Sequence, residues 1–386
     1  MSKASFRIES ALPADWRTGR FVGRVDLGDG PTPILIEGGE AYDMSRAAPT
    51  MSALLAAGPV PASAGAPLGP LDALDLSPAA GAAARLLSPI DLHCVKASGV
   101  TFALSAIERV IEERARGDAG QAAALRERLE SRIGGSIRSV TPGSAEAAAL
   151  KAALIDDGLW SQYLEVAIGP DAEIFTKSPV LSTVGWGWDV GVRSDSSWNN
   201  PEPEVVVIVD PEGRVVGATL GNDVNLRDFE GRSALLLGKA KDNNASCSLG
   251  PFIRLFGDDF AMDDVRAAEL ELTIEGEDGY LLSGRSSMNQ ISRDPEDLVR
   301  QAMSEHHYPD GFALFLGTLF APTQDRDVPG SGFTHKVGDV VTISTPRLGT
   351  LVNPVTTSKA AAPWDFGIGA LMQNLARRGL LSGPRG

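Results

Sequence analysis

Two glutamates in the stretch 199–251 are spaced so that both could bind one metal ion. Glu202 and Glu204 lie two residues apart, and side chains two apart on a β-strand point to the same face. Pro203, between them, suits the start of a strand or an edge strand, because it cannot donate a ladder hydrogen bond. The apolar run 205–209 then continues as a strand expected to be buried on both faces.

A third carboxylate follows on the next predicted strand, 215–220, which ends at a Gly-Asn-Asp turn. Asp223 on this turn can reach the same point as the two glutamates. Three hard oxygen donors without a histidine or thiol favour Mg²⁺, with Mn²⁺ or Ca²⁺ as alternatives, over zinc or copper. Two plainer interpretations stay open: the Glu-x-Glu pair is a solvated strand face, and Asp223 forms an ordinary i,i+4 pair with Arg227.

The order of these motifs, PEPE, then NDxxxRD, then a lysine six residues before C-x-L-G-P, resembles the fumarylacetoacetate hydrolase superfamily. The resemblance implies that Glu202, Glu204 and Asp223 hold a divalent metal. The family lysine corresponds to Lys241 if the motif is aligned on the CSLGP sequence that follows it. It corresponds to Lys239 if the motif is aligned on the Gly-Lys dipeptide, and we prefer Lys241.

Two segments before this stretch resemble the substrate-binding parts of the same superfamily. Residues 99–102 look like the entry to its lid, which implies that Glu108 is the lid acid, although Ser105 stands where the family has a histidine. An amphipathic helix with Glu108 exposed is the competing interpretation. The segment around Lys177 resembles the family's Leu-Phe-x-Lys motif beside the metal, and Glu173 matches an acid of the dehydratase branch. For Glu173 a solvated strand start is the alternative.

The C-terminal half continues the resemblance. Residues 311–321 resemble an apolar strand that ends in Gly-Thr, which implies that Gly317 and Thr318 close the substrate pocket. Arg227 of the NDxxxRD motif and Ser105 are further expected substrate contacts. The Gly-Asp turn at 338–339 and the 348–351 hairpin match the family's late signature.

The resemblance is greatest to the 2-keto-3-deoxy-pentonate dehydratases within that superfamily. It implies a hydro-lyase of oxidative pentose degradation that converts 2-keto-3-deoxy-D-xylonate, a small 2-oxo sugar acid, to 2,5-dioxopentanoate and water. Lys241 or Glu173 would remove the C3 proton, and Glu108 would protonate the departing hydroxyl. An acylpyruvate-type carbon–carbon hydrolase, a decarboxylase and a non-catalytic 2-oxo acid binding protein stay open as alternatives.

The implied fold is α+β and β-rich: a mixed β-sandwich roll like the fumarylacetoacetase C-terminal domain, a helical lid and a small β-rich N-terminal domain. Length suggests two domains. We expect the N-terminal domain, with its Ala/Pro/Gly-rich linker, at 1–85, and the catalytic domain at 86–386 with a helical insertion at 100–160. Strands are predicted at 20–27 and 32–37, and a C-terminal helix at 367–378.

Composition narrows the partners. The chain of 386 residues carries 35 Lys and Arg against 50 Asp and Glu, a net charge of −15, which argues against nucleic acid and anionic membranes. Two cysteines and the lack of a long apolar run predict a cytoplasmic protein. The family implies a homodimer or homotetramer. None of the four histidines is expected to be catalytic, and His93 and His335 are interpreted as surface or structural residues.

Overall fold

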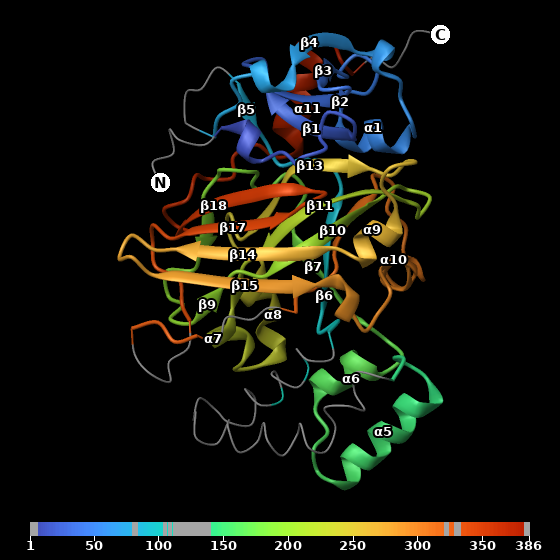
Figure 1. Ribbon diagram of the computed structural model, residues 1–386, viewed down its shortest axis with the longest axis vertical. Coiled ribbons are helices and arrows are strands. Elements are labelled where there is room, and N and C mark those ends of the chain that lie inside the picture. Colours follow the sequence, from blue (N-terminus) through green and yellow to red (C-terminus); the bar gives the residue numbers. More distant parts are fainter. Residues whose placement is uncertain are drawn as a thin grey trace.

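Two β-sheets form the centre of the molecule. The structure, a computed structural model, describes residues 7–78, 84–102, 106, 110, 140–319, 324–327 and 333–381. Strands β1–β4 lie at one end of the molecule and helices α5 and α6 at the other, with most of the remaining strands between them (Figure 1). This α+β, strand-rich architecture agrees with the predicted fold class. None of the described helices combines the length and the apolar character needed to cross a lipid bilayer.

The larger sheet has eleven strands and carries the candidate site. Its order is β4-β3-β2-β1-β13-β11-β10-β16-β6-β7, with β5 also paired to β1. Every pairing is antiparallel except that of β16 with β6. The strands are β1 (Arg20–Asp26), β2 (Pro31–Glu37), β3 (Glu40–Asp43), β4 (Ala66–Pro70), β5 (Arg85–Leu86), β6 (Cys94–Gly99), β7 (Glu173–Ser178), β10 (Pro203–Val209), β11 (Val215–Asp223), β13 (Cys247–Leu255) and β16 (Phe312–Phe315).

The second sheet has five strands in the order β15-β14-β17-β18-β8. Strands β14, β17 and β18 lie against β10, β11 and β13 of the larger sheet, so the two sheets enclose a common core. Its strands are β8 (Val190–Val192), β14 (Glu269–Glu275), β15 (Leu281–Ser287), β17 (Val340–Thr345) and β18 (Gly349–Thr357). A separate two-stranded pair joins β9 (Asn199–Asn200) to β12 (Asn225–Leu226).

The burial of individual strands follows their sequence patterns. Every residue of β10 is buried, as its unbroken apolar run predicts for a strand covered on both faces. Strand β14 alternates exposed and buried residues, because only one of its faces meets the core. The stretch that follows the predicted linker forms two strands, β5 and β6, with a connection at 87–93.

Helices α5 and α6 form a lobe with its own small core. Leu154, Leu159 and Leu164 pack there with the alanines of both helices. Ser144 and Ser161 cap the two helix N-termini by accepting backbone hydrogen bonds. The α-helices that the described residues form are α1 (Met51–Ala56), α5 (Ala145–Asp156), α6 (Gln162–Ile168), α7 (Arg227–Glu230), α8 (Leu237–Lys241), α9 (Met262–Arg266), α10 (Pro295–Met303) and α11 (Ile368–Arg377).

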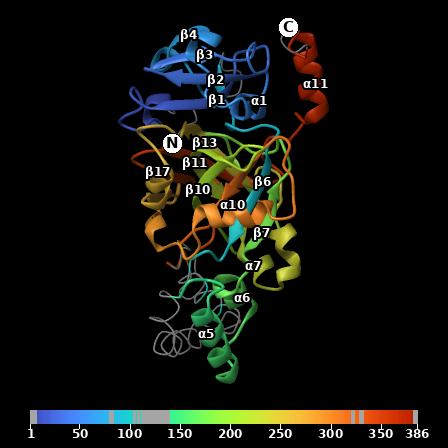
Figure 2. The same cartoon turned by 90° about the vertical axis from the view of Figure 1, so that its right-hand side faces the viewer.

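The N-terminal strands continue the larger sheet, because β1 pairs with β13 at Phe21 and Val22. Part of the predicted linker forms the edge strand β4. The C-terminal helix α11 confirms the predicted helix at 367–378 and lies at the same end as these strands (Figure 2). Asn374 on α11 donates a hydrogen bond to the Asp29 carbonyl oxygen at 2.8 Å. The domain boundary at residue 85 stays a prediction.

His93 and His335 are both buried, so the structure excludes the interpretation that they are surface residues. His335 contacts Asp339, 3.3 Å from its Nδ1 atom, and the ring of Phe333. Both histidines therefore belong to the interior of the protein.

Candidate metal centre and active site

Three carboxylates converge where β10 begins and β11 ends. Glu204 lies opposite Gly221 in the antiparallel β10–β11 pair, and the Asp223 amide donates to the Glu202 carbonyl at 3.0 Å. This register places all three acidic side chains on one face. One oxygen from each of Glu202, Glu204 and Asp223 lies within 4.8 Å of the others, and all three residues are buried. The predicted convergence is therefore present, and Asp223 is on a strand rather than in a helical i,i+4 pair.

Two buried lysines surround these acids. The Lys241 ammonium, at the end of α8, lies 2.5 Å from Glu202 Oε2 and 2.9 Å from Asp223 Oδ2. The Lys177 ammonium lies 2.7 Å from Asp223 Oδ1, an ion pair whose angles fall short of a hydrogen bond. Lys177 also donates to the carbonyl oxygens of Val224 at 3.1 Å and Lys241 at 2.5 Å.

A register shift in the sheet helps to direct Lys177. Val95 of β6 pairs with Ser178 and Lys96 pairs with Thr176, so Lys177 is the extra residue of a bulge in β7. Bulges of this kind re-aim a side chain at the edge of a sheet.

Carboxylates outnumber ammonium groups among the described residues that form the cluster. Three carboxylates lie together there, and the lysines paired with them are Lys177 and Lys241. Burial, with the nearby Asp223 and Glu202 carboxylates, raises the pKa of Glu204 well above its usual range. Burial would also raise the pKa of Asp223, but Lys177 and Lys241 outweigh it and lower that pKa. An added cation would remove the repulsion that Glu204 experiences.

The donor set fits a hard divalent cation. Two oxygens bound to one Mg²⁺ at about 2.1 Å can be at most about 4.2 Å apart, and for Ca²⁺ at about 2.4 Å the limit is about 4.8 Å. The acid cluster therefore needs little closure to hold either ion. Glu202, Glu204 and Asp223 are the residues that would hold it.

Gly317 contacts this cluster through its backbone. Its N–H donates to Glu204 Oε2 at 2.7 Å, and the residue has a positive φ of 94°. A Cβ at this position would lie 2.1 Å from Thr101 Oγ1, so only glycine fits. Thr318, which follows it, is partly exposed. Gly317 thus orients a candidate metal ligand, a role that the resemblance did not imply.

Strand β7 extends the site beyond the lysine. Glu173 and Phe175 lie two residues apart on one face of this strand, and the Phe175 ring centroid lies 5.8 Å from the Lys241 ammonium. Glu173 pairs with Gly99 across the sheet, and a Cβ on Gly99 would lie 2.0 Å from Glu173 Oε2. Four residues at about 3.3 Å each put the Glu173 backbone about 13 Å from that of Lys177, further along the same face.

The other predicted site residues have different outcomes. Arg227 begins α7 and is buried, with its guanidinium carbon 4.7 Å from the Trp198 ring centroid. Lys239, the alternative family lysine, is exposed and lies near the Phe229 ring, whereas Lys241 reaches the acids. Ser105 and Glu108 lie outside the described residues.

Asn225 is a site residue that the sequence analysis missed. Its side chain is fully buried, and Nδ2 donates to Glu202 Oε1 at 3.0 Å and to Glu230 Oε2 at 2.6 Å. The available signal was its spacing two residues after Asp223. Outer-shell donors of this kind hold a ligand carboxylate in one orientation.

Residues 181–356, which include the three acids and Lys241, match the family model of the fumarylacetoacetate (FAA) hydrolase C-terminal domain. This part of the chain belongs to that family, as the motifs predicted.

Two proteins named as dehydratases are similar to part of this chain, with about a third of the aligned residues identical. It is 32% identical over 186 residues to a 2-dehydro-3-deoxy-D-arabinonate dehydratase of Saccharolobus solfataricus, covering 47% of this chain and 58% of that protein. It is also 32% identical over 195 residues to a probable 2-keto-3-deoxyxylonate dehydratase of Haloferax volcanii, covering 50% and 64%. The matches thus span less than two thirds of either relative.

Solved structures agree with the fold over most of the chain. A 2-keto-3-deoxyarabinonate dehydratase in a hexagonal crystal form superposes with a TM-score of 0.63 at 23% identity, covering 88% of this chain and 99% of that one. A 2-keto-3-deoxy-D-arabinonate dehydratase in complex with magnesium and 2,5-dioxopentanoate gives a TM-score of 0.62 with the same identity and coverage.

Proposed function

We propose that the protein is a hydro-lyase that dehydrates a 2-keto-3-deoxy-pentonate to 2,5-dioxopentanoate with a bound divalent cation, Mg²⁺ in the first place. The observation that carries the proposal is the buried, converging cluster of three carboxylates, Glu202, Glu204 and Asp223. The names of the two relatives support the reaction, and the magnesium and 2,5-dioxopentanoate in the similar solved structure support the cation and the product.

The two relatives' names point to one substrate. Conversion of C2 to a ketone and of C3 to a methylene removes two stereocentres, so the D-arabinonate and D-xylonate forms become the same compound. Only C4 stays stereogenic. We therefore propose the D-configured acid, 2-keto-3-deoxy-D-xylonate, as the substrate, and oxidative pentose degradation as its setting.

The reaction begins with loss of a C3 proton beside the 2-oxo group. A divalent cation on the acid cluster supplies Lewis-acid stabilisation of the negative charge that forms on the 2-oxo oxygen. The C4 hydroxyl then leaves as water once it is protonated. Loss of a C5 proton with protonation at C3 gives a C4–C5 enol, which becomes the C5 aldehyde by protonation at C4.

Glu173 is the better placed of the two proposed bases. Burial would lower the pKa of Lys241, but the Asp223 and Glu202 carboxylates outweigh it and raise that pKa. Lys241 is therefore an ammonium group in this arrangement, suited to donate a proton or to neutralise charge. It could act as a base only if another cation neutralised these acids. Glu173, further along the same face of β7, is then the remaining proposed base.

The remaining roles rest on position for Lys177 and Asn225, and on the family resemblance for Ser105 and Glu108. Lys177 fixes Asp223 and the backbone at Val224, and Asn225 fixes Glu202. Gly317 and Thr318 are proposed to border the substrate with Arg227 and Ser105, and Glu108 is proposed to protonate the leaving hydroxyl. We further infer a cytoplasmic homodimer or homotetramer, with the catalytic domain at 86–386.

The direct test is NMR of 2-keto-3-deoxy-D-pentonate with the protein and Mg²⁺ in D₂O. Dehydration gives 2,5-dioxopentanoate with deuterium at C3 and C4. Pyruvate and a two-carbon aldehyde would instead show carbon–carbon cleavage, and binding without turnover would show a 2-oxo acid binding protein. Glu204→Gln should abolish turnover, and undiminished dehydration by that variant or in excess chelator would overturn the proposal.

A further inference from the structure

A second cavity of about 280 Å³ lies between the N-terminal strands and the C-terminal segment. Its walls come from β1, residues 85–88, residues 181–188 and residues 362–366. None of the acids or lysines of the candidate metal centre lines it. Its volume lies just below the range usual for small-molecule sites, so it suits a small ligand.

The cavity contains a buried arginine without an ion-pair partner. Arg24 of β1 is 5% exposed and lines the cavity. Its Nε donates to the Ser88 carbonyl at 3.0 Å. Among the residues that the structure describes, no carboxylate lies within ion-pair distance of Arg24, and its Nη groups make no hydrogen bond. Buried guanidinium groups are normally paired with an acid. The two Nη groups of Arg24 lack such a partner among the described residues.

Asp91, the acid that attracts the Arg24 charge, has its carboxylate occupied by backbone groups. Its carboxylate accepts backbone hydrogen bonds from Met51 at 2.6 Å, Ser52 at 3.1 Å and Leu92 at 2.7 Å. Burial lowers the pKa of Arg24, and Asp91 opposes this only through a longer-range attraction. Arginine nevertheless keeps its charge at neutral pH, so Arg24 brings to the cavity a positive charge that has no ion-pair partner among the described residues.

Flat apolar surface lies beside this charge. Trp188 and Trp364 both line the cavity. Their indole N–H groups donate to the carbonyl oxygens of Leu86 at 2.8 Å and Phe366 at 3.2 Å. Because the N–H groups are already used, the two rings offer their hydrocarbon surfaces to a ligand.

The other charged groups of the cavity are paired or acidic. Arg85 forms an ion pair with Asp26 at 2.6 Å and lies 5.7 Å from the Trp188 ring centroid. Asp365 is exposed at the rim. One free guanidinium among these acids balances a single negative charge and disfavours a dianion such as phosphate.

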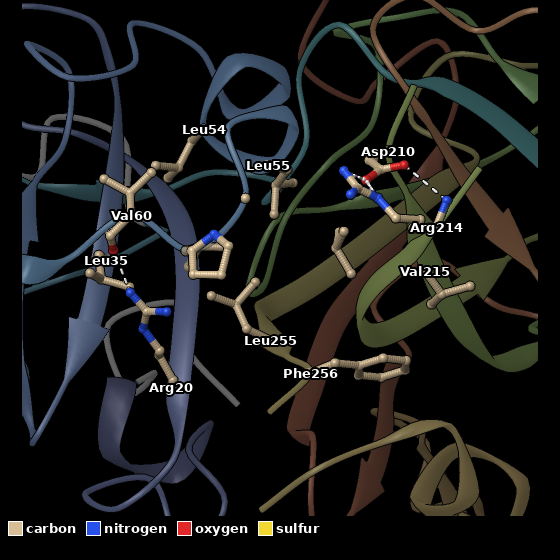
Figure 3. A pocket seen from close by; sticks show the side chains of 14 residues that line it. Arg20, Leu35, Leu54, Leu55, Val60, Asp210, Arg214, Val215, Leu255 and Phe256 are labelled. Carbon is tan, nitrogen blue, oxygen red and sulfur yellow. Dashed lines mark hydrogen bonds and ion pairs between the residues drawn. The ribbon is translucent and has the colours of Figure 1, made fainter. Parts of the chain in front are cut away.

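A comparable cavity shows what an occupied arginine looks like. The cavity of about 260 Å³ in Figure 3 also lies beside β1, but Arg20 donates there to the Val60 carbonyl and Arg214 to Asp210. Arg20 is also paired with Glu37 at 3.1 Å. Both arginines of that cavity have partners within the protein. Of these two cavities, the Arg24 cavity is the one that combines a buried arginine without an ion-pair partner with aromatic walls.

We propose that the Arg24 cavity is a second ligand site, which binds a small organic monocarboxylate. The carboxylate would take both Nη groups of Arg24, a bidentate geometry that matches the planar guanidinium. The carbon body would lie against Trp188 and Trp364. A sugar acid and an aromatic acid share this chemistry. The site does not depend on the proposed dehydratase activity.

The test is isothermal titration of the full-length protein, in chelator, with benzoate, D-xylonate and inorganic phosphate separately. At least one carboxylate should bind with a stoichiometry of one. Arg24→Met should weaken that binding at least tenfold, and Trp364→Ala severalfold. Arg20→Met, on the same strand, and Glu202→Gln, in the candidate metal centre, should leave it unchanged. Whichever carboxylate binds identifies the source class.

The proposal would be overturned by no saturable carboxylate binding, by equal binding of the carboxylate to Arg24→Met, or by tighter binding of phosphate than of both acids. Loss of binding in Glu202→Gln would place the ligand in the metal centre instead and would also overturn it. If Arg24→Met does not fold, Arg24→Lys is measured instead, because lysine keeps the positive charge but cannot bind a carboxylate through two parallel N–H groups. Carboxylate binding equal to wild type in both Arg24→Lys and Trp364→Ala would contradict the proposed geometry.

Discussion

The Lys177 ammonium lies 2.7 Å from the Asp223 carboxylate, and the two side chains are only 0% and 2% exposed. Removal of one member of such a buried pair leaves the other charged in a low-dielectric interior, which costs about 3–5 kcal/mol. We expect Lys177→Met to lower the free energy of unfolding by about that amount in urea denaturation. Lys96→Met removes a lysine that donates a hydrogen bond to Thr176 on the neighbouring strand, and it should lower the free energy of unfolding by less than about 0.5 kcal/mol. Equal effects of the two changes would argue against the importance of the pair.

A divalent cation should stabilise the folded protein. A ligand that binds only the folded state adds about 2.7 kcal/mol at a concentration of 100 Kd. Thermal denaturation in Mg²⁺ and in chelator should therefore give a clear increase in Tm for the wild type. The increase should disappear in Glu204→Gln and persist in Glu212→Gln, which changes an exposed acid at the β10–β11 turn. A wild type indifferent to Mg²⁺, Mn²⁺ and Ca²⁺ would refute the metal centre.

Asn225 is expected to tune cation affinity through Glu202. Loss of an outer-shell hydrogen bond typically weakens metal binding about 10–100-fold. Asn225→Ala should show this loss in titration with Mn²⁺, while far-UV circular dichroism stays unchanged. Asn222→Ala is a useful comparison, because Asn222 Oδ1 contacts the Glu202 backbone at 3.3 Å rather than the carboxylate. If Asn222→Ala weakened Mn²⁺ binding more than Asn225→Ala, the assigned role would be wrong.

Gly317 should tolerate no side chain. A left-handed conformation alone costs an L-residue about 1–2 kcal/mol, and at Gly317 a Cβ would also collide with Thr101. Gly279→Ala gives the matched control, because Gly279 has a φ of 80° with nothing within 4 Å of the added Cβ. We expect Gly317→Ala to lose more stability than Gly279→Ala by about 1–3 kcal/mol, and to lose activity. A similar loss of unfolding free energy in both variants would mean that the Thr101 side chain moves aside at little cost.

The buried His335 should make stability depend on pH. Burial lowers its pKa, even though the hydrogen bond with Asp339 opposes that change. The unfolded chain then takes up the proton first as pH falls through about 6.5, so the free energy of unfolding decreases on acidification. His335→Gln should make this decrease between pH 7 and pH 5 smaller, measured by urea denaturation at several pH values.

His307→Gln, an exposed histidine, should leave the slope unchanged. The slope will not vanish in His335→Gln, because burial also lowers the pKa of His93, and that histidine acts in the same direction. A steeper acid loss in His335→Gln than in the wild type would contradict the sign of the effect.

The amino-acid sequence by itself determined the strands of the site and the acids on them. Local spacing sufficed for Glu202 and Glu204, because strand alternation is a property of the backbone. Asp223 was expected on a turn after a strand at 215–220, whereas β11 continues through Asp223 and carries it to the glutamates. The apolar run 205–209 likewise predicted a strand buried on both faces, and every residue of β10 is buried. These features depend on near neighbours in the chain.

Only the tertiary structure decided which distant groups meet these acids. Lys177 precedes Asp223 by 46 residues and enters the cluster through a bulge in β7, while Gly317 reaches Glu204 because β16 pairs with β10. Arg24 and Ser88, 64 residues apart, meet at the second cavity in the same way. Strand order is set by which apolar faces pack together over the whole chain, so contacts of this kind cannot be read from local spacing.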